Sequence, residues 1–413
     1  MSVYVEPLKL GRRADYTFKM NTVTGRHGWL RLTPAYSLKI VEEIISAHPR
    51  AKRVLDPFCG TGTTALTAVY HGRDAVTVDI NPFLVWLADV KTRCFSPSDV
   101  VRTAEACREV TSIVTRKSVD PWTSPPIHNI QRWWDADTLE YLRLLRAGID
   151  AVAGSDTPVH ALLLVAFCRT MIKLSNAAFN HQSMSFKEQQ QLRIDLGVDY
   201  NSVFTEDVHF VLEGASENPR GSASVLLGDA RYVDRYVHVP VDLVVTSPPY
   251  ANRISYIREL RPYMYWLGFL ASGREAGELD WQAIGGTWGI ATSRLANWKR
   301  PDNRFVSEHL ESVIDEIRRA GNPSGAILAN YLVKYFDDMW EHFCNLTSVL
   351  SPGAEVHYII GNSKFYNTVV ATEHLYAEML ERLGFEQVRC VPVRKRNSKK
   401  ELIEFDVTGK WRG

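Results

Sequence analysis

The feature that most constrains the fold is a glycine-rich turn that joins a strand to a helix. Residues 53–58 (RVLDPF) read as a short β-branched strand, and the turn CGTGTT follows directly. The next segment, ALTAVYHG, is typical of a helix, and a second strand pattern, DAVTVDI (residues 74–80), contains an acid at its tip. Strand, turn, helix and strand form a βαβ unit, so we predict an α/β fold with a parallel sheet.

The turn has the spacing that lets a nucleotide-containing cofactor approach the backbone. Gly60, Gly62 and Ala65 match the G-x-G-x-x-G/A pattern. Asp56 ends the first strand, and Asp79 lies about 20 residues past the glycines, where a carboxylate can accept both ribose hydroxyls. Two simpler interpretations stay open: the glycines can serve an ordinary turn, and Asp79 can cap the following helix.

The acid beside the turn favours a cationic cofactor. An aspartate so close to a pyrophosphate would be unfavourable in a dinucleotide site, whereas Asp56 can pair with the ammonium group of an amino-acid tail. The chain contains no GxxxxGK[ST] sequence, which excludes a P-loop nucleotide-binding protein. A sulfonium cofactor such as S-adenosylmethionine therefore fits best.

The tetrapeptide Ser247-Pro248-Pro249-Tyr250 follows the apolar strand VDLVVT directly. Two prolines cannot continue the strand ladder, and they hold the chain extended with its carbonyl groups pointing outward. A nucleobase amine needs acceptors for its two hydrogens before its nitrogen can attack a methyl group. A serine hydroxyl and the Pro248 carbonyl can be those acceptors, and Tyr250 offers a face for a flipped base. The alternative is a strand terminator with a core tyrosine.

Together these motifs resemble the amino-group DNA methyltransferases. The likeness rests on DPFCGTGTT, TVDINP, GDAR and TSPPY, and it extends to TGRHGWLRLTPAYS, PGAEVHYIIGNS and LGFE, over residues 24–95 and 221–410. It implies a seven-stranded Rossmann-like fold with S-adenosylmethionine as methyl donor. SPPY is usual in the N4-cytosine members, whereas N6-adenine members usually carry DPPY or NPPY. The glycine turn precedes SPPY here, unlike in many cytosine-N4 enzymes, which makes cytosine less secure.

The resemblance also assigns roles to individual residues. The cofactor would contact Asp56, Phe58, Gly60 and Gly62 around its methionine part, Asp79 at its ribose, Asp229 at its adenine amino group and the N-terminal motif that contains Thr33. The catalytic loop would be Ser247, Pro248, Pro249 and Tyr250. No Pro-Cys dipeptide is present, so the covalent mechanism of C5-cytosine methylation lacks its usual nucleophile.

We expect a class I methyltransferase core with a helical and a smaller irregular insertion. The expected segments are 1–96 with the N-terminal cofactor motif and the first half of the core, 97–220 as a mostly helical insertion, 221–270 with the catalytic loop, 271–325 as a basic and aromatic insertion, and 326–413 as the rest of the core. The helical insertion, with its polar stretch 174–187, is the candidate for target recognition.

The formal net charge of +1 gives no indication of a polyanionic partner, so DNA contact must depend on local groups. Basic side chains near the catalytic loop, in the smaller insertion and near the C-terminus are the predicted phosphate contacts: Arg253, Arg258, Arg294, Lys299, Arg300, Arg394 and Arg396. A core helix, a solvated loop or a solvated charge run would explain the same patterns.

The cysteine and hydropathy patterns indicate the cellular compartment. The six cysteines are scattered with no CxxC pair and no zinc-finger spacing, so we expect a reduced cytoplasmic protein of a prokaryote, without disulfides or a metal site. The longest apolar run is about half of the ~20 residues that a membrane span needs, so no membrane partner is expected.

The sequence therefore predicts a DNA cytosine-N4 methyltransferase that acts on a flipped base of double-stranded DNA. A restriction-modification setting with a cognate endonuclease is expected. Three alternatives stay open: adenine-N6 methylation by the same residues, methylation of an RNA base, and an inactive cofactor-binding regulator.

Overall fold

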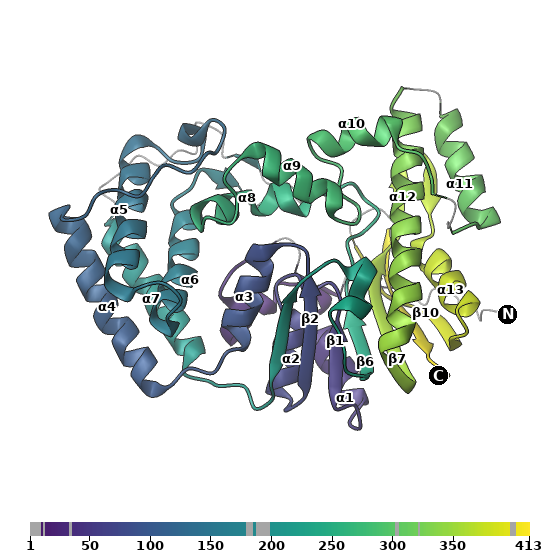
Figure 1. The fold of residues 1–413 in the computed structure, drawn as a ribbon, viewed down its shortest axis with the longest axis horizontal. Helices are drawn as coiled ribbons and strands as arrows, with labels where there is room; N and C mark the ends of the chain where they lie inside the picture. The colour runs from purple at the N-terminus through teal and green to yellow at the C-terminus, as the bar shows by residue number, and fades with distance from the viewer. Residues whose placement is uncertain are drawn as a thin grey trace.

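One seven-stranded sheet organises the protein in the computed structural model (Figure 1). The structure describes residues 10, 13–32, 35–178, 185–186, 199–301, 305–320, 323–396 and 402–413. The strand order is β10-β11-β7-β6-β1-β2-β5. The strands are β1 (Arg53–Asp56), β2 (Asp74–Asp79), β5 (Ala223–Leu227), β6 (Val241–Thr246), β7 (Leu350–Gly361), β10 (Glu386–Lys395) and β11 (Ile403–Lys410).

Within this sheet β11 pairs antiparallel with both β7 and β10, and the other neighbours pair parallel. This mostly parallel sheet with helices around it confirms the predicted Rossmann-like fold. Leu55 of β1 pairs with Val76 of β2 and Val244 of β6, so these three strands end at the same edge. The acids that the sequence places at strand tips are therefore brought together.

The alternation of side chains along the strands gives the sheet two apolar faces. On one face, Val54, Leu243 and Ile359 pack against α1 (Leu38–Ala47) and α2 (Thr63–Tyr70). Side chains of the opposite face, such as Leu55, Val244 and Tyr358, pack against three helices nearer the C-terminus. Those helices are α11 (Glu308–Arg319), α12 (Pro323–Leu346) and α13 (Thr372–Arg382).

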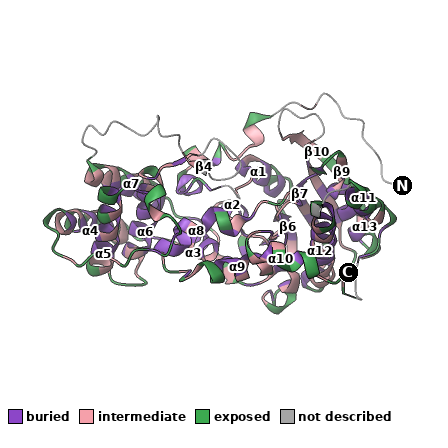
Figure 2. Cartoon of the chain, turned by 90° about the horizontal axis from the view of Figure 1, so that it is seen from above, coloured by how far each residue is buried: buried purple, intermediate pink, exposed green. Residues whose placement is uncertain are grey.

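A helical lobe extends from one side of the sheet (Figure 1). It contains α3 (Pro82–Thr92), α4 (Pro97–Arg116), α5 (Ala136–Ala153), α6 (Pro158–Lys173), α7 (Tyr200–Ala215) and α8 (Tyr256–Trp266), and the short pair β3 (Ala177–Ala178) and β4 (Ser185–Phe186). Trp134, Phe167 and Trp266 form its aromatic centre. Buried residues accordingly occur both in this lobe and along the sheet (Figure 2).

Residues 271–325 differ from the irregular chain that the sequence led us to expect. They hold α9 (Gly273–Gln282), α10 (Ile290–Asn297) and α11. In α11, Leu310, Val313, Ile314 and Ile317 repeat at helical spacing and are buried. Glycines and short turns between the helices hid this pattern. A second hairpin, β8 (Ser363–Phe365) and β9 (Thr368–Val370), follows β7.

A buried arginine, Arg26, attaches the N-terminal segment to the ends of two helices. The Arg26 guanidinium donates to the carbonyls of Lys91 and Arg93 near the end of α3, and to those of Gly214 and Ala215 in the last turn of α7. A cation at two helix C-termini is electrostatically favourable. These bonds fix the path of the chain toward Arg31 and Leu32, which line the cavity described below. No helix in the described part of the chain is long and apolar enough to cross a membrane.

Candidate active site

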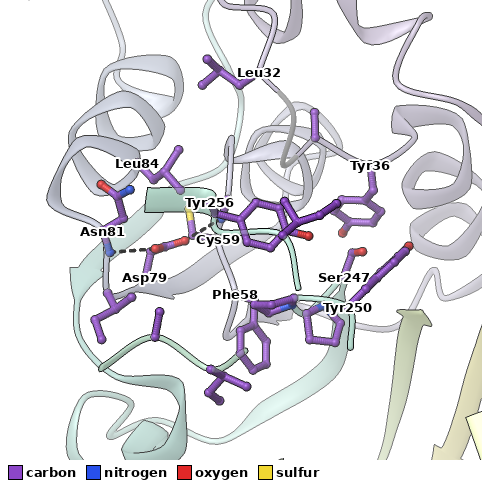
Figure 3. A pocket seen from close by; sticks show the side chains of 18 of the residues that line it. Leu32, Tyr36, Phe58, Cys59, Asp79, Asn81, Leu84, Ser247, Tyr250 and Tyr256 are labelled. Atoms are coloured by element: carbon purple, nitrogen blue, oxygen red, sulfur yellow. Dashed lines mark hydrogen bonds between the residues drawn. The ribbon is translucent and has the colours of Figure 1, made fainter. Parts of the chain in front are cut away.

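A cavity of about 430 Å³ lies where β1, β2 and β6 end (Figure 3). Its volume is in the usual range for small-molecule sites, about 300–1,000 Å³. The turn after β1, the tip of β2, the loop after β6, the N-terminal segment, α9 and β10 with β11 all contribute to its lining. Predicted site residues that line it are Phe58, Gly60, Asp79, Asp229, Ser247, Pro248, Pro249, Tyr250, Arg394 and Arg396.

The two glycines of the turn have different roles in this structure. Both have positive φ angles, 52° at Gly60 and 76° at Gly62, which favour glycine. Gly60 lines the cavity, and its N–H donates to Oδ2 of Asp79 at 2.8 Å. A Cβ at Gly62 would lie 3.0 Å from the Cβ of Ala88 in α3, and Gly62 does not line the cavity. Gly62 therefore permits close packing of α3, not the predicted cofactor contact.

Asp79 lies beside the glycine turn, and backbone N–H groups orient both of its carboxylate oxygens. Oδ1 accepts from the N–H of Asn81 at 2.9 Å, as Oδ2 does from Gly60. Burial raises the pKa of Asp79 to about 7. The cap of α3 is Asn81, whose side chain accepts from the N–H of Phe83. Asp79 is thus not the helix cap, and it faces the cavity as a ribose contact would require.

We expect cofactor affinity to weaken as the pH falls through 7. Protonated Asp79 accepts hydrogen bonds less well, and its raised pKa of about 7 places that loss near neutrality. Asp79→Asn should weaken binding at pH 8 and remove the transition near pH 7. Isothermal titration of S-adenosylmethionine between pH 5.5 and pH 8.5 measures both. Asp74→Asn, at the exposed start of the same strand, is the matched control, and an unchanged pH profile in Asp79→Asn would refute this role.

Asp56 is buried at the end of β1, is not among the residues that line the cavity, and has one carboxylate oxygen unpaired. Its Oδ1 accepts from the hydroxyl of Thr246 at 2.6 Å and from the N–H of Phe58 at 3.1 Å. Its Oδ2 is buried and has no hydrogen-bond partner among the described residues. Burial raises the pKa of Asp56 to about 6. A buried, unpaired carboxylate oxygen fits a site that receives a cationic group, such as the ammonium of S-adenosylmethionine.

Of the remaining predicted cofactor residues, two line the cavity but already contact other side chains, and one is not described. Phe58 lines the cavity and packs edge-on against His342, with ring centroids 5.0 Å apart. Asp229 also lines it, but its carboxylate pairs with Arg231 at 2.6 Å, so only part of its accepting capacity is left for an adenine amino group. Thr33 lies outside the described residues, as do residues 179–184 and 187 of the polar stretch 174–187.

The catalytic loop presents acceptors toward the cavity. The hydroxyl of Ser247 donates to the carbonyl of Ile359 in β7 at 2.9 Å, which leaves the serine lone pairs free to accept. The Pro249 carbonyl accepts from the hydroxyl of Tyr335 at 2.8 Å. No described residue donates to the carbonyl of Pro248. One hydroxyl and one carbonyl are therefore left as acceptors for an amine.

Tyr250 is held by the C-terminal strands. Its hydroxyl donates to Oε1 of Glu404 at 2.9 Å, and the guanidinium of Arg396 lies 4.8 Å from its ring centroid. Arg394 pairs with Glu404 at 2.7 Å because the two residues are partners in the β10–β11 register. Arg394 and Arg396 thus belong to the cavity wall, and their predicted contact with DNA phosphates stays a prediction.

The other predicted phosphate contacts differ in how exposed they are and in whether an acid already pairs with them. Arg300 is mostly buried and pairs with Asp337 and Glu311, which argues against a role on DNA. Arg294 makes an exposed pair with Glu278, and such pairs exchange readily for other partners. Exposed side chains are found at Arg253, Arg258 and Lys299, which keeps them available to phosphates.

The lining residues that were not predicted as site residues include Tyr36, Asn81, Tyr256 and Glu404. The ring of Tyr256 lies between the Asp79 side of the cavity and the Ser247 side (Figure 3). The side-chain amide nitrogen of Asn81 is buried without a partner in the described structure and can donate to a ligand. Tyr36 and Asn81 stood inside motifs already noted. Tyr256 stood in the basic and aromatic stretch after SPPY, where the sequence favoured a core helix, and nothing in the sequence indicated Glu404.

Part of the chain matches a known protein family. Residues 38–118 match the family described as D12 class N6 adenine-specific DNA methyltransferase. Similar proteins are Type II methyltransferase M.MvaI of Kocuria varians (20% identity, 89% of this chain and 84% of that protein) and M.BsoBI of Geobacillus stearothermophilus (21%, 97% and 87%). Type II methyltransferase M.AvaI of Nostoc sp. is 20% identical over 94% of this chain and 86% of its own.

Among solved structures, the rRNA methyltransferase aviRa from Streptomyces viridochromogenes aligns with a TM-score of 0.25 and 11% identity. The alignment covers 91% of this chain and 86% of that one.

Proposed function

We propose that the chain is an amino-group DNA methyltransferase that uses S-adenosylmethionine to methylate an exocyclic amine of a base in double-stranded DNA, as its similarity to the D12 class family and to Type II methyltransferases suggests. The observation that carries this proposal is the shared cavity. Asp79 and Gly60 line one side of it, and the acceptors of the SPPY loop line the other. Cofactor and base groups would therefore meet in one cavity.

The chain's own residues account for binding and orientation. S-adenosylmethionine supplies an electrophilic methyl group on its sulfonium. Asp56 would hold the ammonium, Asp79 the ribose, and the free amide of Asn81 a further polar atom of the cofactor. Ser247 and the Pro248 carbonyl would accept the two amine hydrogens and direct the nitrogen lone pair toward the methyl group. Such a step depends mainly on positioning in a site that excludes water.

Adenine is the target that the comparisons favour, in contrast to the cytosine expected from SPPY. The matched family is described as N6 adenine-specific, and the match covers residues 38–118, which hold the cofactor turn and end before the catalytic loop. Cytosine remains the second candidate because Ser247 stands where N6-adenine members usually carry Asp or Asn. Either amine can be held by the same two acceptors.

Nucleoside analysis of cellular DNA distinguishes the two bases. We would express the chain in a bacterial host that lacks both modifications, digest the genomic DNA and measure nucleosides by mass spectrometry. N6-methyladenine alone supports the family description, and N4-methylcytosine alone supports the Ser247 argument. Host DNA carrying neither modification, from cells that contain folded protein, would count against methylation of DNA by this chain.

The position of the acceptors in a cavity wall bears on how DNA would be engaged. A base inside a duplex cannot reach such a site, so we propose that the target base is flipped out. Arg253, Arg258 and Lys299 are the proposed phosphate contacts, and the helical insertion 97–220 is proposed to read the sequence. The Type II relatives suggest a restriction-modification setting with a partner endonuclease.

Removing the ring of Tyr250 should weaken the methylation step more than removing its hydroxyl. Stacking of a base on an aromatic ring contributes about 1–3 kcal/mol, so Tyr250→Ala should lower kcat/KM for DNA about tenfold or more. Tyr250→Phe keeps the ring and loses only the bond to Glu404, so its loss should be smaller. Steady-state kinetics with saturating cofactor measures both. Equal losses in the two variants would exclude stacking on Tyr250.

A further inference from the structure

Three metal-ligating side chains from distant parts of the chain meet on the sheet face that α1 covers. His48 directly follows α1, and Glu355 and His357 lie on β7. One ligand atom from each lies within 4.8 Å of the others, and the two imidazole centroids are 5.1 Å apart. All three side chains are half-buried. Across the ranges that the structure describes, no other three such groups lie this close together.

Both histidines use Nδ1 for a hydrogen bond to an oxygen outside the group of three. Nδ1 of His48 lies 2.7 Å from the carbonyl oxygen of Ile44, and Nδ1 of His357 lies 2.9 Å from Oδ2 of Asp406. Each partner is an acceptor, so the proton of a neutral ring must be on Nδ1. Each Nε2 then carries a lone pair, which is the form that binds metals.

A cation would give these lone pairs a partner. Nε2 of His48 faces Oε2 of Glu355 at 3.1 Å, and Nε2 of His357 is buried without a hydrogen-bond partner in the described structure. A proton on His48 would satisfy Glu355 but would leave His357 unpaired. One metal ion can accept a bond from all three groups. Lys410 approaches only the other carboxylate oxygen of Glu355, at 3.9 Å, and leaves Oε2 free.

We propose that His48, Glu355 and His357 bind a divalent transition metal, with Zn²⁺ as the best fit. Two imidazoles and one carboxylate form a ligand set that Zn²⁺ accepts, whereas Ca²⁺ and Mg²⁺ prefer oxygen alone. Asp406 supplies the carboxylate that commonly orients a metal-bound histidine. Glu355 is 42% exposed, so it can move to bonding distance, and a water can complete the coordination.

The position of the group indicates a structural role. The ion would join the end of α1 to β7, and α1 follows the N-terminal residues that line the cavity. His357 lies two residues before Ile359, whose carbonyl accepts from Ser247. None of the three ligands lines the cavity, so the metal takes no part in the methylation proposed above. Spacing patterns did not indicate this group, because His48 and Glu355 are 307 residues apart and meet only through the fold.

Zinc binding to the full-length protein tests the proposal. Chelator-treated protein is titrated with ZnCl2 by calorimetry, and Co²⁺ replaces Zn²⁺ to give an absorption spectrum that reports coordination. We expect one Zn²⁺ per chain, lost in His48→Gln and in His357→Gln. Asp406→Asn should weaken the affinity about 10–100-fold. The exposed His71→Gln is the matched control and should bind as the wild type does.

Stability gives the second readout. Zn²⁺ should raise the melting temperature of the wild type and of His71→Gln, and should leave that of His48→Gln unchanged. His48 lies at a helix end, so this variant is informative even where His357→Gln fails to fold. Absence of stoichiometric binding to the wild type, or equal affinity in His48→Gln, overturns the proposal. Either result leaves the methyltransferase assignment intact.

Discussion

Asp56→Asn is expected to lose cofactor binding and to gain stability in the same protein. The carboxylate holds an unpaired, buried oxygen at the end of β1. Removing one partner of a buried ion pair costs about 3–5 kcal/mol, so affinity for S-adenosylmethionine should fall about 100-fold or more. Isothermal titration at pH 8 measures the loss. Retention of wild-type affinity would exclude Asp56 as the ammonium contact.

The stability of the cofactor-free protein should change in the opposite direction. Burial raises the pKa of Asp56 from its ordinary value of 3.8 to about 6 in the folded protein. Between pH 3.8 and pH 6 the native state therefore binds more protons than the unfolded state. This carboxylate therefore lowers stability as the pH rises through that window, by up to about 3 kcal/mol at pH 8. Asparagine removes the charge, but its amide hydrogens lack an acceptor, so we expect a net gain of about 1–2 kcal/mol.

Urea unfolding at pH 8 and at pH 4.5 measures this second effect. The gain should be present at pH 8 and nearly absent at pH 4.5, where the wild-type carboxyl is protonated in the folded protein. Asp315→Asn, an exposed position in α11, is the control and should alter neither stability nor cofactor affinity. A loss of stability at pH 8 would show that Asp56 is paired in the cofactor-free protein, contrary to the geometry.

Ser247→Ala is expected to lower kcat about 10²- to 10³-fold and to leave cofactor affinity within about twofold. Loss of one positioned hydrogen-bonding group at a reacting centre typically has an effect of this size. The Ser247 hydroxyl already donates to Ile359, so its lone pairs are directed to other partners. The side chain would hold the amine, not the cofactor, which separates its effect from that of Asp56.

Single-turnover kinetics with saturating DNA and cofactor measure this loss without product release. Ser348→Ala, an exposed serine outside the cavity, should retain full activity. Restored activity is not expected at higher cofactor concentration, because the cofactor site is intact. If Ser247→Ala instead raised only the cofactor KM, the assignment of the two halves of the cavity would have to be exchanged.

The part of the site that could be predicted from the sequence is the part that local geometry fixes. Asp56 and Asp79 end neighbouring parallel strands, and strands of such a sheet end at one edge, so their meeting follows from the βαβ pattern. Ser247 follows β6, which joins the same edge. Gly62 satisfied the same motif but serves the packing of α3, because a spacing pattern does not distinguish a ligand contact from a helix contact.

The rest depends on contacts between residues far apart in sequence. Glu404 reaches Tyr250 only because β11 lies beside β7, and the pairing of β10 with β11 brings Arg394 next to Glu404 in the cavity wall. A run of cations near the C-terminus suggested a phosphate surface, whereas strand register determines which of them face acids. Tyr256 belongs to α8, whose position over the cavity depends on packing in the helical lobe.

Transfer of a labelled methyl group to duplex DNA tests the central claim most directly. The purified chain is incubated with duplex DNA, and in parallel with RNA, in the presence of S-adenosylmethionine carrying a deuterated methyl group, and the nucleosides are identified by mass spectrometry beside a Ser247→Ala sample. We expect the label on the exocyclic nitrogen of adenine or cytosine, and only traces of it with the variant. Label on C5 of cytosine, label in RNA alone, or equal incorporation by the variant would contradict the assignment.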